Sequence, residues 1–62
     1  MSAQEALERA EELLAKLEEV RGRLEATEDP QVALDLLGEL SDLARQVQSE
    51  IEQASRESDA HA

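Results

Sequence analysis

The stretch Thr27-Glu28-Asp29-Pro30 interrupts an otherwise continuous helical pattern and decides the fold of this chain of 62 residues. Aspartate is a favoured N-cap residue, and proline is favoured at the first position of a helix because that position needs no backbone N–H. The stretch therefore predicts that one helix ends near Ala26 and that a second helix begins at Pro30. A turn as short as residues 27–29 makes the two helices antiparallel neighbours.

The outer ends of the two helices follow from local signals. Ser2 and Glu5 have the spacing of a capping box, which predicts a first helix over residues 3–26. The second helix is expected over residues 30–54, because no apolar residue anchors the chain after Ala54. Residues 1–54 are thus predicted to form one helical hairpin, and residues 55–62 a disordered tail.

Apolar residues recur in both predicted helices at alternating steps of four and three, the period of a left-handed helix–helix seam. The predicted seam of the first helix is Ala3, Leu7, Ala10, Leu14, Leu17, Arg21 and Leu24. The predicted seam of the second is Ala33, Leu37, Leu40, Ala44, Val47, Ile51 and Ala54. The fold class is therefore all-α, an antiparallel two-helix hairpin.

A second apolar column accompanies each predicted seam and makes the apolar face wider than two helices require. It consists of Ala6, Leu13 and Val20 in the first helix and of Val32, Leu36 and Leu43 in the second. A lone hairpin would leave such a face in water. We expect self-association into a four-helix bundle, or docking onto the helices of another protein. The predicted interface residues are Leu13, Val20, Arg21, Val32, Leu36 and Leu43.

Three residues break the local rules. Arg21 occupies a predicted seam position, where its stem can cover apolar surface while its head reaches water or an acid such as Asp35, Glu39 or Glu25. Its alternative role is a charge that specifies register or partner. Gly22 and Gly38 each cost a helix about 1 kcal/mol relative to alanine, and they indicate either close helix approach or an exposed position that tolerates glycine.

The composition excludes several classes of function. With 16 acidic and 6 basic residues the formal charge is −10, which opposes direct binding to nucleic acid or to an anionic membrane. Most glutamates fall on the face opposite the predicted seam, as solvated helix surfaces do. The chain has no cysteine and no long apolar run, so we expect no disulfide, no membrane span and a cytoplasmic location.

The sequence offers no candidate catalytic, cofactor or metal site. A nucleophile needs a base beside it in a pocket, whereas the serines here lie at a cap, on exposed helix positions or in the tail. The two glycines stand alone and form no phosphate-binding loop. The only histidine, His61, lies in the predicted tail, apart from the glutamates with which a bundle-core metal site would need it. We therefore expect a protein that is not an enzyme.

Three stretches resemble the small subunit of bacterial exodeoxyribonuclease VII. They are EALERAEELLAKLEE in the first helix, the LEA at 24–26 before the turn, and ALDLLGELSDLARQVQSEIEQA in the second helix, so that the likeness covers about residues 4–54. Members of that family are short acidic helical hairpins without catalytic residues. The resemblance implies that several copies pack on the long helices of a large nuclease subunit, whose metal-dependent chemistry degrades single-stranded DNA.

Together these observations predict a non-catalytic helical interaction or accessory subunit. Its expected partners are further copies of itself and a large nuclease subunit. Two alternatives remain open at this point. One is a stand-alone homodimeric bundle, natural or designed, without a nuclease partner. The other is an acidic mimic of DNA that occupies a nucleic-acid-binding protein, a role suggested by the charge alone.

Overall fold

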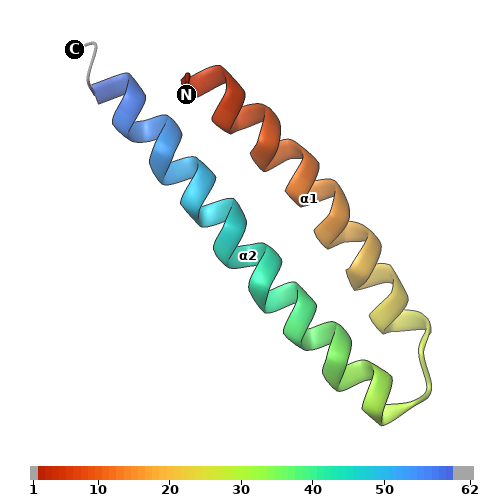
Figure 1. The fold of residues 1–62 in the computed structure, drawn as a ribbon. Coiled ribbons are helices and arrows are strands. Elements are labelled where there is room, and N and C mark those ends of the chain that lie inside the picture. Colours follow the sequence, from red (N-terminus) through yellow and green to blue (C-terminus); the bar gives the residue numbers. More distant parts are fainter. Residues whose placement is uncertain (1, 60–62) are drawn as a thin grey trace.

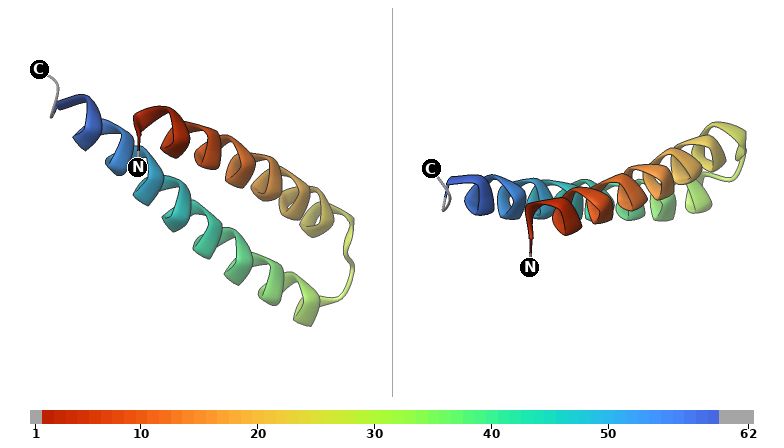
Figure 2. Two further views of the ribbon diagram at one scale, coloured as in Figure 1. Left: turned by 45° about the horizontal axis from the view of Figure 1, so that its top comes forward. Right: turned by 90° about the horizontal axis from the view of Figure 1, so that it is seen from above.

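The computed structural model is an antiparallel hairpin of two α-helices, and it describes the backbone of residues 2–59 and the side chains of residues 2–57. Helix α1 spans Ala3–Ala26 and helix α2 spans Pro30–Asp59 (Figure 1). The two helices lie side by side in one layer, with the turn at one end of the molecule and the beginning of α1 and the end of α2 toward the other (Figures 1 and 2). The predicted all-α hairpin is confirmed.

Local capping explains where the helices begin. The backbone N–H of Glu5 donates to the hydroxyl of Ser2 at 3.1 Å, and that hydroxyl donates to the Glu5 carboxylate at 3.3 Å. At the start of α2, the backbone N–H of Gln31 donates to the Asp29 carboxylate at 2.9 Å. Both caps form as the sequence predicts. Each satisfies a backbone donor that has no partner within its helix.

Helix α2 runs further than the sequence analysis expected. The predicted end at Ala54 is wrong, because the helix continues to Asp59, and residues 55–59 of the predicted disordered tail are therefore helical. The chain keeps its contact with α1 here, since Ala54 is buried and Glu57 is partly buried. Gln53 also donates to Glu57 one turn later, at 3.4 Å. The rest of the predicted tail, residues 60–62, lies outside the described residues.

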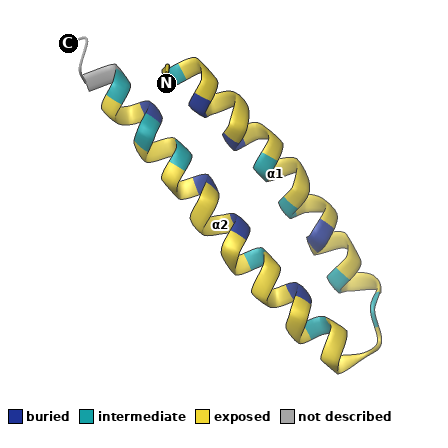
Figure 3. Ribbon diagram, in the orientation of Figure 1, coloured by how far each residue is buried: buried dark blue, intermediate teal, exposed yellow. Residues whose placement is uncertain are grey.

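The buried seam keeps every second position of the predicted one and replaces each of the others by the residue directly before it. Leu7, Leu14, Leu37 and Ile51 were expected to face the other helix, but each is about half exposed, at 50–51 %. The buried side chains instead lie along the inner sides of the helices (Figure 3). They are Ala6, Ala10, Val20, Leu36, Leu43, Val47 and Ala54, with Leu13, Leu17, Leu24 and Leu40 packed against them.

The shift changes which charged residue lies in the seam: it keeps Arg21 out of the seam on α1, and on α2 it places Glu50 there instead of Ile51. Two heptad registers share the positions Ala3, Ala10, Leu17 and Leu24. One of them completes the seam with Leu7, Leu14 and Arg21; the other completes it with Ala6, Leu13 and Val20. The first would take the Arg21 guanidinium out of water, and removing a charge from water is costly. The second buries only aliphatic side chains on α1, and it is the one observed.

Candidate interaction surface

The two broad faces of the hairpin are made by the columns that flank the seam. On α1, Leu7, Leu14 and Arg21 directly follow a seam residue, whereas Arg9, Lys16 and Arg23 directly precede one. Since each residue turns the helix by about 100°, these two columns lie on opposite sides of the seam. The same rule places Leu37, Ala44 and Ile51 on one side of α2, and Val32, Glu39 and Gln46 on the other.

Open depressions between the helices show which columns share a face. One is lined by Lys16 and Arg23 of α1 together with Glu39, Asp42 and Gln46 of α2. A second is lined by Arg9 and Lys16 together with Gln46 and Glu50. The columns that precede the seam therefore lie side by side, and we call this surface the charged face. The columns that follow the seam lie together on the opposite surface.

That opposite surface, the apolar face, consists of Leu7, Leu14, Leu34, Leu37, Ala44 and Ile51. Leu34 is the most exposed of its large side chains, at 63 %. Contiguous exposed aliphatic residues are uncommon on a chain that acts alone in water, and they indicate a surface that contacts another molecule. Every one of these residues lies on a rigid helix. The surface is therefore formed before any partner binds.

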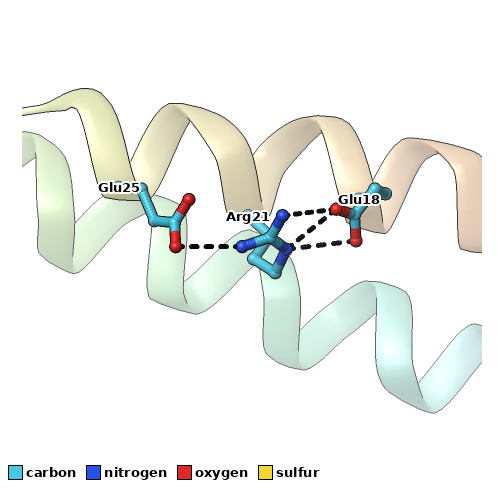
Figure 4. Close-up of polar contacts among 3 residues, drawn as sticks. All are labelled: Glu18, Arg21 and Glu25. Atoms are coloured by element: carbon cyan, nitrogen blue, oxygen red, sulfur yellow. Dashed lines mark hydrogen bonds and ion pairs between the residues drawn. The ribbon is translucent and has the colours of Figure 1, made fainter.

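Arg21 interrupts the apolar face on α1 and is held by acids of its own helix (Figure 4). Its Nε donates to both carboxylate oxygens of Glu18, at 3.0 and 3.1 Å, and its Nη1 lies 3.1 Å from Glu25. The hydrogen bonds from Arg21, together with its positive charge, hold the pKa of Glu18 below its usual value. The same contacts raise the pKa of the Arg21 guanidinium above its usual value.

The expected role of the Arg21 head is thus confirmed, with its partners better defined. Glu25 was among the three acids considered, but Glu18, the acid with the most contacts, was not. Its position three residues before Arg21 is an ordinary spacing for a pair on one helix face, so the sequence held the signal. The Arg21 side chain stays 47 % exposed, and such a pair contributes little to stability.

The structure divides the six predicted interface residues among three places. Val20, Leu36 and Leu43 are buried within the hairpin, and Leu13 is packed against them. Arg21 lies on the apolar face, and Val32 is an exposed residue in a column of the charged face. The sequence analysis predicted an uncovered apolar face but assigned to it the column that the structure buries, in place of Leu7, Leu14, Leu37 and Ile51. The signal that could have found it was Arg21, because a register that leaves Arg21 in water also leaves Leu7, Leu14 and Ile51 there.

Gly22 and Gly38 lie outside both faces. Each stands two residues before a seam position, on the outer side of its helix, and a Cβ atom built on either would meet nothing within 4 Å. Neither glycine serves a close approach between α1 and α2. Of the two alternatives weighed from the sequence, tolerance at an exposed position is the one that holds within the hairpin.

The acidic side chains of the described residues were considered as a possible metal site. Among them, no three acidic, histidine or cysteine side chains gather closely enough to hold a metal ion, and His61 is not one of the described residues. The seam of α2 also includes charged residues: Glu50 and Glu57 are both partly buried, and the Oε1 of Glu50 has no hydrogen-bond partner. Glu50 lies at the depression that Arg9 and Lys16 also line, which brings opposite charges together at the rim of the seam.

Neither described helix carries an apolar stretch of the length and hydropathy needed to cross a membrane. The chain was compared with protein-family models, with curated proteins and with solved structures, and none of them matches it.

Proposed function

We propose that this chain is a non-catalytic interaction protein that pairs through its apolar face with a second copy of itself, forming a four-helix bundle. The observation that carries the proposal is the apolar face: one layer of two helices leaves Leu7, Leu14, Leu37 and Ile51 half exposed along one side. Helical bundles close such a face by placing a second layer of helices over it.

The size of the face suits a dimer of this chain. The outline of the molecule, 49 Å long and 14 Å wide, has an area of about 690 Å² per copy, or about 1,400 Å² for a pair, so a face of this size is large enough for an interface in the usual range of specific complexes. A second copy also matches the face in length, because two identical hairpins overlap from end to end. Closed pairing through the same surface on both copies is the commonest form of protein self-association.

The composition of the charged face also supports the apolar face as the interface. Lys16 and Arg23 share it with Glu39 and Asp42, so it carries both signs of charge and remains suited to water. This mixture does not favour a mimic of DNA, which would present a surface of one sign. Docking onto the helices of a nuclease subunit would use the apolar face as well. The two functions therefore differ only in which protein covers that face, a second copy of this chain or a different protein.

Sedimentation equilibrium tests the proposal. The chain has no tryptophan or tyrosine, so its concentration is followed by peptide-bond absorbance. We expect the mass of a dimer or of a larger even assembly at micromolar concentration, and a melting temperature that rises with concentration because assembly stabilises the fold. A helical monomer whose melting temperature is independent of concentration would contradict self-association. It would leave a different protein as the occupant.

A pair of variants assigns the face. Replacing Leu14 and Leu37 together by glutamine places four polar side chains in the interface of a dimer and should weaken pairing by at least about 100-fold. Val32→Gln is the matched control, because Val32 is also an exposed aliphatic residue of α2 but lies in a column of the charged face. If Val32→Gln disrupts pairing and the double variant does not, the charged face is the interface.

A further inference from the structure

We infer that the two copies pack with α1 of each on α2 of the other, so that both turns lie at the same end of the bundle. This inference rests on the proposed self-association through the apolar face. Two hairpins can stack by the same face around a two-fold axis in two ways. Either the turns lie together and α1 covers the partner's α2, or the turns lie at opposite ends and each helix covers its own counterpart.

The outer rims of the apolar face differ between the helices. Along α1 the rim is formed by Glu11, Glu18 and Glu25, which are exposed and spaced seven residues apart beside Leu7, Leu14 and Arg21. Along α2 the corresponding positions, beside Leu37, Ala44 and Ile51, hold Leu34, Ser41 and Gln48. One helix therefore borders the apolar face with carboxylates, and the other borders it with neutral side chains.

These rims favour the arrangement with the turns together. If α1 packed on the partner's α1, two rows of glutamates would meet, and the pair of Arg21 side chains would offset only part of their charge. If α1 packs on the partner's α2, each row of glutamates meets a neutral row, in which Ser41 and Gln48 can donate hydrogen bonds to carboxylates. Complementary rims of this kind select one geometry over another.

The sizes of the apolar side chains favour the same arrangement. Leu14 and Ala44 lie at about the same height in the hairpin, near its middle, since Leu13 and Lys16 of α1 line a depression with Gln46 of α2, and Lys16 also lines one with Leu43. With the turns together, Leu14 of each copy meets Ala44 of the other, a large side chain against a small one. With the turns apart, Leu14 meets Leu14 and Ala44 meets Ala44, which crowds one layer and leaves a gap beside it.

A distance between spin labels tests the inference. Cysteine introduced as Glu28→Cys in the exposed turn is the only cysteine of the chain, so a nitroxide label reacts at that position alone. Because packed helix layers lie about 10 Å apart, turns that lie together should give a distance between labels below about 30 Å by pulsed dipolar spectroscopy. Turns at opposite ends would give a distance near the 49 Å length of the molecule.

A second labelled position supplies the control. Ala15 is exposed near the middle of α1 and belongs to neither face, so Ala15→Cys carries a label without disturbing either surface. Because bundle helices pack 8–10 Å apart, the two labels should lie within about 30 Å of each other in either arrangement. A short distance at both positions supports the inference. A short distance at residue 15 with a long one at residue 28 overturns the inference and leaves the dimer standing. No distance between labels at either position, with a monomer by sedimentation, overturns the proposed dimer as well.

Discussion

The two broad faces of this hairpin come from the same two helices, yet one is aliphatic and the other is charged. The difference lies in which column flanks the seam: Leu7 and Leu14 follow seam residues, whereas Lys16 and Arg23 precede them. On the charged face, basic residues of α1 lie beside acidic residues of α2, and that surface is complete in water. The apolar face is not. This difference between the two faces is what supports the proposed bundle, in which a second layer of helices covers the apolar face.

The largest expected effect comes from two adjacent leucines that belong to different surfaces. Leu36 is 3 % exposed in the seam, and Leu37 is 51 % exposed on the apolar face. Leu36→Asp removes a buried side chain and puts a charge in its place, which should cost about 3–5 kcal/mol and abolish most of the helical circular dichroism signal. Equal helicity in the variant and the original chain would refute the observed seam.

Leu37→Asp is the companion measurement. It leaves the interior of the hairpin unchanged, so its main effect should be on assembly: a shift toward the monomer by sedimentation, with helicity recovered as concentration rises. If Leu36→Asp and Leu37→Asp lose helicity equally at every concentration, the seam and the apolar face are not separate surfaces.

Replacing Arg21, which interrupts the apolar face, by leucine should make this face a better interface for a second copy. Arg21→Leu extends the column of Leu7 and Leu14 and removes only exposed ion pairs, which contribute little. Burying one more leucine in each copy should tighten self-association by about tenfold or more, measured by sedimentation. Weaker association would show that Arg21 contacts the partner and specifies it, the alternative role that its sequence position suggested.

Gly22 and Gly38 offer a change that touches neither face. Alanine at each position has open space around its Cβ atom and a higher helix propensity than glycine, so each substitution should stabilise the fold by up to about 1 kcal/mol. The measurement is the urea midpoint, with the assembly state followed in parallel. A loss of assembly would place a partner against the outer side of the helices, and it would contradict the bundle proposed from the apolar face.

The smallest expected effect is the pH dependence that Glu18 contributes. Arg21 lowers the pKa of Glu18 in the folded chain, so the ionised carboxylate is favoured by folding. The ion pair between Glu18 and Arg21 stabilises the folded chain at a pH above the pKa of Glu18 in the unfolded chain, about 4.3. This stabilisation is lost as the pH falls through the lower pKa of Glu18 in the folded chain. The melting temperatures of the original chain and of Glu18→Gln should therefore differ slightly at about pH 6 and converge at about pH 3. A difference that grows toward low pH would contradict the pairing.

Several features of the fold could be read from single residues. The beginnings of both helices could be predicted from Ser2 with Glu5 and from Asp29 with Pro30, because a cap consists of hydrogen bonds between residues at most three apart in the sequence. The far end of α2 could not be read in this way, since the helix continues to Asp59 without an apolar residue after the buried Ala54. Propensity alone is a weak guide where contacts with another helix decide.

The candidate surface depended on a choice that apolar spacing left open. Leu13 and Leu14, or Leu36 and Leu37, fit a 3.5-residue repeat equally well, and adjacent leucines cannot both face the same neighbouring helix. The sequence by itself determined two helices, one short turn and an apolar stripe too wide for two helices to cover. Tertiary structure alone decided which leucine of each pair is buried. The physical reason is that the choice depends on how α1 packs against α2. The observed register leaves Arg21 in water and places Glu50 rather than Ile51 in the seam, and the leucines left outside the seam become part of the apolar face.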